Sequence, residues 1–243
     1  MQERLTPEEW GKHYNPALLN GVVQAIREKR HSAQTVEMLK LTFPQERILE
    51  IGCGSGATSL TLACEGRICT AIDNATDAVV LVSAVAEQLH CPCEVLFADA
   101  MQELPFEENA FDVSFQAGLL EHFHKEERIH LLKLWGRISK RMVSLIPNAS
   151  SLAYRLGKAR MEKKGIWPYG LEMPQYSLAQ EFAAAGFDVV DEYTIGEEHA
   201  LQFLPRWHPL RVALKTIYVS GLLSDNAGQG YLLVTIGKKR ESC

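Results

Sequence analysis

The sequence predicts an α/β fold with a doubly wound, mostly parallel sheet of seven strands. From residue 47 to residue 148, short apolar runs alternate with amphipathic stretches at the spacing of βαβ units. Two more strand patterns follow, at residues 187–195 and 231–236. The first apolar run ends at alternating glycines, Gly52, Gly54 and Gly56, as a buried strand does when it turns tightly into a helix. These observations imply crossovers that cover both faces of the sheet.

Helical patterns precede the first strand. Thr6, Pro7 and the two acids that follow form a helix start, and further helices are predicted over residues 16–30 and 33–41. In the alternating region we expect strands at residues 47–51, 68–73, 93–98, 112–116 and 142–146, with helices at 57–64, 75–89 and 126–140.

The regular alternation stops after Pro147. A basic helix is predicted over residues 149–164, then a loop rich in breakers and aromatic residues, a helix at 178–185, and two helices within 197–228. We therefore expect a helical cap at 1–45, a core at 46–148, an insertion or lid at 149–176, and the rest of the sheet at 177–243.

Composition narrows the class of partner. The chain has 243 residues and a formal net charge of −5, which disfavours a nucleic acid as partner. It shows no signal-peptide pattern and no apolar run of membrane-spanning length, so we expect a cytoplasmic protein with no membrane partner and reduced thiols. Cys91 and Cys93 lack a second ligand cluster nearby, so no metal site is expected. The oligomeric state is not legible in the sequence.

Polar residues follow four of the predicted strands. Glu50 precedes the glycine turn, Asp73 and Asp99 end the second and third strands, and Gln116 ends the fourth. Ligands of parallel sheets collect outside the carboxyl ends of the strands, so these positions predict one cofactor pocket. Taken alone, the glycine turn also fits a dinucleotide fingerprint, with Asp73 placed to hold a ribose.

Four segments in this region carry a family resemblance. Residues 49–56 (LEIGCGSG), 71–73 (AID), 97–100 (FADA) and 111–115 (FDVSF) with 120–123 (LEHF) resemble the successive motifs of class I S-adenosylmethionine-dependent methyltransferases, in order and spacing. The match covers about residues 47–148. It implies a Rossmann-like methyltransferase fold and S-adenosyl-L-methionine as the cofactor. The cofactor-binding residues that it implies are Tyr14, Glu50, Gly52, Cys53, Gly54, Gly56, Asp73, Asn74, Asp99, Ala100, Gln116 and Gly118.

The resemblance places the glycine turn beside the methionine portion of the cofactor, Asp73 on the ribose hydroxyls, and Asp99 with Ala100 at the adenine. Physical chemistry agrees, since one carboxylate can accept both hydroxyl donors of a ribose. The end of the fourth strand then faces the reactive methyl group. His122 is the candidate general base and Glu121 its orienting partner or a binding group for a cationic substrate. The sequence leaves open whether His122 instead only packs beneath the cofactor.

Acceptor recognition is expected outside the common core. Trp10 and Tyr14 are expected to fold over the cofactor mouth or to pack in the core. Candidate substrate-binding residues after the fifth strand comprise basic, aromatic and acidic side chains: Tyr154, Arg155, Trp167, Tyr169 and Glu172. We expect a small-molecule acceptor.

Two other functions remain possible from the sequence. Tyr154 and Lys158 form a Y-x-x-x-K string similar to the catalytic pair of short-chain NAD(P)-dependent oxidoreductases, although those enzymes have a longer glycine spacing than Gly52 to Gly56. The other alternative is a non-catalytic domain that keeps the cofactor pocket for regulation.

Overall fold

A seven-stranded sheet forms the centre of the molecule in a computed structural model, which describes residues 3–220 and 228–240. The strand order is β3-β2-β1-β4-β5-β7-β6, and β7 runs antiparallel to both neighbours while the other pairings are parallel. This confirms the predicted fold class. The strands are β1 (Arg47–Ile51), β2 (Ile68–Asp73), β3 (Cys93–Phe97), β4 (Phe111–Ala117), β5 (Ser139–Pro147), β6 (Phe187–Ile195) and β7 (Leu232–Lys239).

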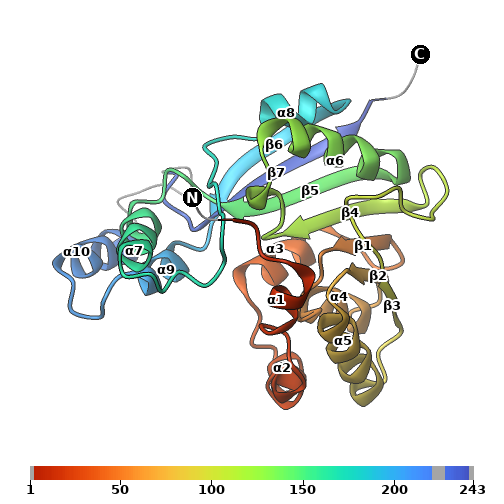
Figure 1. Cartoon of the computed structure of the whole chain (residues 1–243), viewed down its shortest axis with the longest axis horizontal. Coiled ribbons are helices and arrows are strands. Elements are labelled where there is room, and N and C mark those ends of the chain that lie inside the picture. Colours follow the sequence, from red (N-terminus) through yellow and green to blue (C-terminus); the bar gives the residue numbers. More distant parts are fainter. Residues whose placement is uncertain (1–2, 221–227, 241–243) are drawn as a thin grey trace.

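Helices cover both faces of the sheet (Figure 1). One face carries α2 (Leu19–Arg27), α3 (Ala33–Leu41), α4 (Ala57–Cys64) and α5 (Thr76–Leu89), and the other carries α6 (Lys125–Ile138) and α8 (Ala179–Ala184). Neighbouring strand residues point into opposite layers, as Ile48 and Leu49 do. Burial on both faces explains why the central strands read as continuous apolar runs.

A short helix, α1 (Pro7–Gly11), lies before the covering helices and is followed by η1 (Pro16–Leu18). Its start is fixed by a capping box, in which Thr6 accepts from the Glu9 backbone and the Glu9 side chain accepts from the Thr6 backbone. The helix packs closely on the first turn of α5 at Gly11. A Cβ at this position would lie only 3.0 Å from an Asp77 carboxylate oxygen, so the close approach needs a glycine. This contact brings the N-terminal segment to the carboxyl edge of the sheet.

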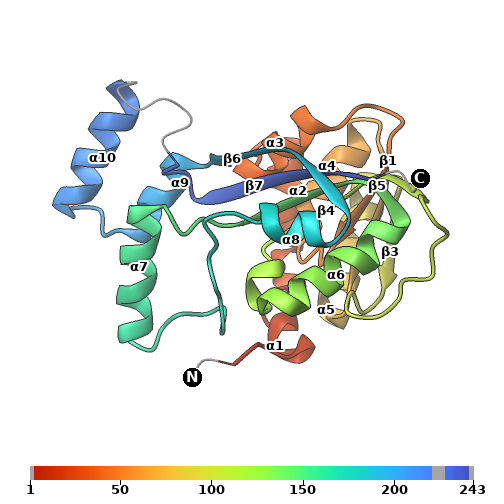
Figure 2. The ribbon, with the colours of Figure 1, turned by 90° about the horizontal axis from the view of Figure 1, so that it is seen from above.

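A second group of helices lies beyond the carboxyl ends of β4 and β5 (Figures 1 and 2). It comprises α7 (Leu152–Lys163), α9 (Glu197–Ala200), η3 (Leu201–Phe203) and α10 (Pro209–Ser220). Ala153, Ala200, Leu201, Leu204 and Leu214 form a separate small core here. The lobe therefore joins part of the predicted insertion at 149–176 to residues far along the chain.

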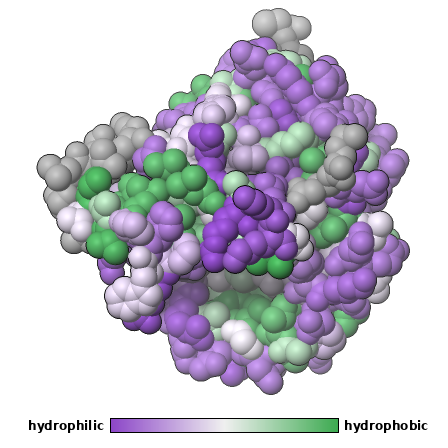
Figure 3. Space-filling view, turned by 60° about the vertical axis from the view of Figure 1, so that its left-hand side comes forward, coloured by the Kyte–Doolittle hydropathy of each residue, from purple (hydrophilic) through white to green (hydrophobic). Residues whose placement is uncertain are grey.

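The surface of this lobe exposes apolar side chains. Figure 3 shows hydrophobic residues gathered there, and Val212 and Trp207 are 56% and 85% exposed.

Among the described residues, no helix combines the length and the apolar character needed to cross a membrane.

Several element boundaries differ from the predictions for local reasons. The helix predicted from residue 149 begins at Leu152, because Asn148 and Ser151 instead bind the backbone carbonyls of residues 228–230. The strand predicted at residues 231–236 continues to Lys239, because the Lys239 ammonium contacts Glu108, Asn109 and the Arg137 carbonyl.

Candidate functional site

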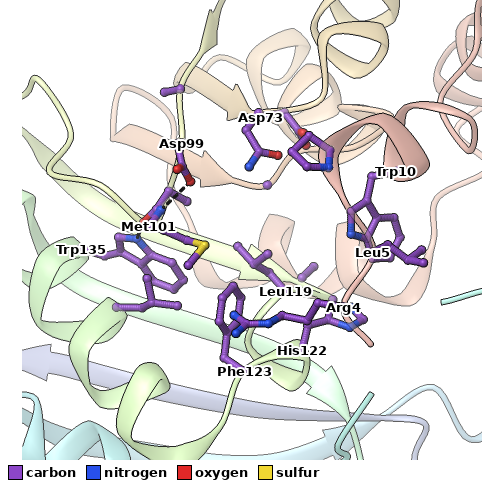
Figure 4. A pocket seen from close by; sticks show the side chains of 18 of the residues that line it. Arg4, Leu5, Trp10, Asp73, Asp99, Met101, Leu119, His122, Phe123 and Trp135 are labelled. Carbon is purple, nitrogen blue, oxygen red and sulfur yellow. Dashed lines mark hydrogen bonds between the residues drawn. The ribbon is translucent and has the colours of Figure 1, made fainter. Parts of the chain in front are cut away.

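A cavity of about 370 Å³ lies at the carboxyl ends of β1, β2, β3 and β4 (Figure 4). This volume falls within the range of small-molecule sites. Asp73 and Asp99 lie on one side of the cavity, with His122 and Phe123 across from them. The walls come from the strand ends, α6 and the N-terminal segment: Arg4, Leu5, Pro7, Trp10, Tyr14, Gly52, Asp73, Asn74, Ala98, Asp99, Ala100, Met101, Ala117, Gly118, Leu119, His122, Phe123, Leu131 and Trp135.

The glycine turn after β1 is built from three residues with positive φ: 70° at Gly52, 52° at Gly54 and 65° at Gly56. Each glycine serves a different contact. A Cβ on Gly54 would lie 2.7 Å from the Tyr14 ring, and one on Gly56 would lie 2.5 Å from Val82 of α5. Gly52 faces the cavity. The turn therefore lets one helix and one aromatic ring approach bare backbone.

Asp73, at the end of β2, ties the glycine turn to the start of α5. One carboxylate oxygen accepts from Gly54 N at 2.9 Å and the other accepts from Ala75 N at 2.9 Å. Burial raises the pKa of Asp73, while the backbone donors, including Asn74, oppose that shift. The two oxygens together offer about four lone-pair positions, so the carboxylate keeps capacity for a hydroxyl group of a ligand.

The segment after β3 forms an end of the cavity suited to a flat ring. Asp99 accepts from Met101 N at 3.0 Å, and the Trp135 indole donates to the Ala100 carbonyl at 2.9 Å (Figure 4). The Trp135 bond anchors this segment to α6. With Met101 and Leu131, the wall combines apolar surface with one carboxylate.

Five of the predicted cofactor residues lie outside the cavity lining: Glu50, Cys53, Gly54, Gly56 and Gln116. Glu50 points to the α4 face, where its carboxylate accepts from Ser59 N at 3.0 Å and from the Ser59 hydroxyl, and burial raises its pKa to about 7. Gln116 accepts from Leu119 N and Leu120 N at 2.9 and 3.2 Å. Both side chains support the wall from behind, and direct cofactor contact by them stays a prediction.

The N-terminal segment closes one side of the cavity. The Glu3 carbonyl accepts from Leu171 N at 2.9 Å, and Arg4 pairs with Glu127 at 2.6 Å. Trp10 stacks on Tyr14 at a ring separation of 6.5 Å. Both predicted aromatic residues, Trp10 and Tyr14, therefore line the mouth.

His122 faces the cavity from η2 (Leu120–His122), the short helix after β4. Its Nδ1 lies 2.5 Å from the Leu171 carbonyl, which requires a hydrogen on Nδ1 and leaves Nε2 as the acceptor of the neutral ring. Burial lowers the pKa of His122, and the carbonyls of Leu171 and Gly118 oppose this. Trp10 packs edge-on against the imidazole at 5.2 Å. The ring is therefore fixed, neutral and oriented.

Glu121 lies behind His122 and is only 2% exposed. Its Oε1 is 3.9 Å from His122 Nε2, and Oε2 has no hydrogen-bond partner among the described residues. Burial, and then the charge of Glu172, raise the pKa of Glu121 well above its ordinary value.

The predicted substrate residues divide into two groups. Tyr154, Trp167, Tyr169 and Glu172 form one cluster: Tyr154 donates its hydroxyl hydrogen to Glu172, and Trp167 packs on both tyrosines. Arg155 is exposed on α7 and does not join them.

The Y-x-x-x-K pair is engaged elsewhere, with the Tyr154 hydroxyl on Glu172 and the Lys158 ammonium on Glu162. Neither residue lines the cavity.

Sequence reasoning missed much of the cavity wall. Leu131 and Trp135 sit on the buried stripe of α6, where no sequence signal separates a cavity wall from core packing. Arg4 and Leu5 precede the first helix and carry no motif. Among the described residues, no group of three or more His, Cys, Asp or Glu side chains is arranged to hold a metal ion.

Comparison with known proteins gives one family match. A family model for a methyltransferase domain matches residues 48–141. A curated relative, a ubiquinone biosynthesis O-methyltransferase from Psychrobacter cryohalolentis, is 27% identical over 136 residues, covering 49% of this chain and 50% of the relative. The match thus spans about half the length of that protein.

Solved structures share the fold at low identity. A possible histamine N-methyltransferase from Thermotoga maritima has a TM-score of 0.61 at 17% identity, over 93% of this chain and 98% of that one. Magnesium protoporphyrin IX methyltransferase from Synechocystis has a TM-score of 0.58 at 14% identity, over 90% and 83%. A [4+2]-cyclase has a TM-score of 0.57 at 18% identity, over 86% and 80%, so the fold alone does not fix methyl transfer.

Three observations indicate the same class of protein. They are the strand order with its antiparallel β7, the cavity that holds both Asp73 and Asp99, and the match to a methyltransferase domain over residues 48–141. Residues 48–141 therefore match a methyltransferase domain, and the chain shares its fold with S-adenosylmethionine-dependent methyltransferases of known structure.

Proposed function

We propose that this protein uses S-adenosyl-L-methionine to methylate a small-molecule acceptor. The observation that carries the proposal is the shared cavity: Asp73 and Asp99 line one side, and the fixed, neutral His122 lines the other. Asp73 can accept hydrogen bonds from the hydroxyl groups of a ribose, and the apolar end of the cavity can hold a flat base. A nucleoside would therefore fit there, with His122 placed to act as a base on a neighbouring nucleophile.

The residues present fit the cofactor. Asp73 would accept hydrogen bonds from the ribose hydroxyls through carboxylate lone pairs that no backbone N–H group occupies. Asn74 lies beside it in the cavity wall. Asp99 would accept from the adenine amine while Trp135 and Met101 wall the ring. When bound, the cofactor supplies a methyl group on a positively charged sulfur.

The work of the chain is mainly positioning. Holding nucleophile, methyl carbon and leaving group in line contributes roughly 7–11 kcal/mol to the lowering of a barrier. The end of β4 and η2 provide one wall, and Trp10, Tyr14 and Leu5 cover the opening. Excluding water there strengthens each electrostatic contact inside.

The acceptor and the location complete the proposal. A net charge of −5 supports a small molecule over a nucleic acid. The five described cysteines are free thiols, which supports a cytoplasmic location.

Calorimetry with S-adenosylmethionine, S-adenosylhomocysteine and NADPH tests the proposal. We expect the two sulfur nucleosides to bind and to raise the melting temperature, with no effect of NADPH. Turnover against a panel of acceptors then separates an enzyme from a domain that only binds the cofactor. Binding of NADPH alone would overturn the proposal.

Replacing Asp73 with asparagine should weaken S-adenosylhomocysteine binding about tenfold to a hundredfold, because a charge-assisted bond is worth about 1.5–3 kcal/mol. The substitution keeps the shape and removes the charge. The matched control is Asp188→Asn, an exposed β6 residue paired with Arg240. Both variants are measured by calorimetry and thermal melting, and an unchanged Kd in the first would remove Asp73 from the ribose site.

Replacing Gly54 with alanine should weaken cofactor binding in addition to straining the backbone. The new methyl group would meet the Tyr14 ring at 2.7 Å, so the ring must move from the mouth of the cavity. Gly165→Ala is the control, since Gly165 has φ of 66° and nothing within 4 Å. We expect about 1–2 kcal/mol of destabilisation in both variants, with weaker cofactor binding only in Gly54→Ala. Equal affinities would show that the Tyr14 contact does not matter.

A further inference from the structure

Two buried glutamates interact behind the wall of the cavity. Glu121 is 2% exposed and Glu172 is 7% exposed. Glu172 accepts the hydroxyl hydrogen of Tyr154, whereas Oε2 of Glu121 has no partner among the described residues. A buried carboxyl oxygen without a partner is costly, so this atom marks a place where a donor is missing.

The unpartnered carboxyl lies within reach of the cavity. Gly118 and His122 both line the cavity. A Cβ on Gly118 would lie 3.5 Å from Glu121 Oε1, and the same oxygen lies 3.9 Å from His122 Nε2. Glu121 does not itself line the cavity, but its Oε1 lies directly behind these two lining residues.

Acidic groups outnumber the cations around Glu121. Lys158 is paired with Glu162, and Arg4 is paired with Glu127, so neither cation is committed to Glu121. The groups that face the pair are Glu121 and His122 from η2, Tyr154, Lys158 and Glu162 from α7, Tyr169 and Glu172 from the following loop, Tyr231 before β7, and Arg4 from the N-terminal segment.

Burial raises the pKa of Glu172 to about 7. Burial, and then the charge of Glu172, raise the pKa of Glu121 well above its ordinary value. A bound cation would favour the ionised form of Glu121 and lower that pKa again.

Three aromatic rings form a continuous cluster that begins at the cavity, where Trp10 is a lining residue. Trp10 stacks on Tyr169 at 6.3 Å, and Tyr169 packs on Trp167 at 5.3 Å. Trp167 is 9% exposed, and its indole nitrogen has no hydrogen-bond partner among the described residues. The Lys158 ammonium lies 4.8 Å from the centre of the Trp167 ring, so this wall already holds one alkylammonium group.

We propose that the acceptor is a small aromatic amine, whose ammonium group binds between the Glu121 carboxylate and His122 Nε2 while its ring lies on the wall of Trp10, Tyr169 and Trp167. This inference rests on the proposed methyl transfer and names its substrate class. It explains together the unpartnered carboxyl oxygen, the excess of acid and the aromatic wall.

The transfer step balances with the residues present. His122 Nε2 takes one proton from the ammonium, and the resulting imidazolium is stabilised by the Glu121 carboxylate beside it. The freed nitrogen lone pair forms the new nitrogen–carbon bond while the carbon–sulfur bond breaks with its electron pair on sulfur. The positive charge of sulfur thus passes to the methylated nitrogen, and His122 returns its proton to solvent.

Matched amines and alcohols test the inference. The probes are 2-phenylethylamine, tyramine and tryptamine, each against the alcohol of the same skeleton, titrated at pH 7.5 with and without S-adenosylhomocysteine. We expect at least one amine to bind about tenfold or more tightly than its alcohol. Because a bound ammonium group favours the ionised form of Glu121, that amine should release protons on binding, measured as a difference in heat between phosphate and Tris buffers.

Glu121→Gln should bring the amine to the affinity of the alcohol and abolish the proton release, with S-adenosylhomocysteine binding and melting temperature retained. Glu37→Gln, at a buried glutamate on α3, is the control and should keep the preference for the amine. The inference is overturned if no amine is preferred, or if the preference survives in Glu121→Gln. Amine preference without any binding of S-adenosylhomocysteine would instead refute the proposed function and leave an amine site.

Discussion

Replacing Arg128 with methionine should lower the free energy of unfolding by about 3–5 kcal/mol, the usual cost of breaking a buried ion pair on one side. Arg128 is 4% exposed and its guanidinium lies 2.7 Å from the Glu181 carboxylate, which is equally buried. The same group donates to the Phe123 carbonyl at 2.8 Å and to the Gln175 side chain at 3.2 Å. The substitution would leave all three acceptors unpaired.

The loss of these hydrogen bonds should also disturb the cofactor cavity. Phe123 directly follows His122, and Gln175 lies in the loop after Glu172, so Arg128 holds the segments that carry these two residues against α6. We therefore expect weaker cofactor binding in Arg128→Met even at temperatures where the variant is folded.

Urea denaturation followed by circular dichroism measures the effect. Arg240→Met is the control, because its ion pair with Asp188 is exposed and should be worth less than about 1 kcal/mol. The double variant Arg128→Met with Glu181→Leu should recover much of the loss, since replacing both members of a buried pair is often neutral. A single-variant loss no larger than that of the control would contradict the assigned role of Arg128.

Elements with strong periodicity and clear stops could be predicted from the sequence. The bounds of β1, β2, α3 and α4 match the predictions residue for residue. The two strands end at a glycine or an aspartate that caps the next turn, so pattern and breaker coincide. The order of elements, with the family motifs, was sufficient to predict a doubly wound sheet and its ligand edge.

Side-chain direction at the strand ends could not be predicted as well. Glu50 and Gln116 stand at the ends of neighbouring strands, as expected, but they bind Ser59 and the backbone of Leu119 behind the cavity wall. A sequence shows that a polar residue ends a strand, whereas the packing of the next helix decides which face it takes. Asp73 differs because its own turn needs its carboxylate at the cavity.

Partners across long loops were also beyond the sequence. Tyr154 and Arg155 are adjacent on α7, yet one is fully buried on Glu172 and the other is exposed. The direction in which α7 meets η3 decides between them. That contact depends on Gly157, where a Cβ would lie 2.4 Å from Phe203.

Replacing His122 with asparagine should lower turnover by about a hundredfold to ten-thousandfold, the usual contribution of a general base. Asparagine is chosen because its amide can still donate to the Leu171 carbonyl, as Nδ1 does now, while nothing replaces Nε2. Folding and S-adenosylhomocysteine affinity should therefore be retained. His124→Asn, at an exposed neighbour, should leave turnover unchanged.

The pH dependence of turnover gives a second, independent test of His122 as the general base. Only the neutral imidazole accepts a proton, and burial lowers the pKa of His122 below the ordinary value of 6.5. Wild-type turnover at saturating acceptor should therefore be constant above pH 6.5 and fall as the pH drops below that value, and His122→Asn should lose this fall. If His122→Asn kept both wild-type turnover and the fall at low pH, the imidazole would only pack against Trp10, and the proton would have to leave the acceptor by another route.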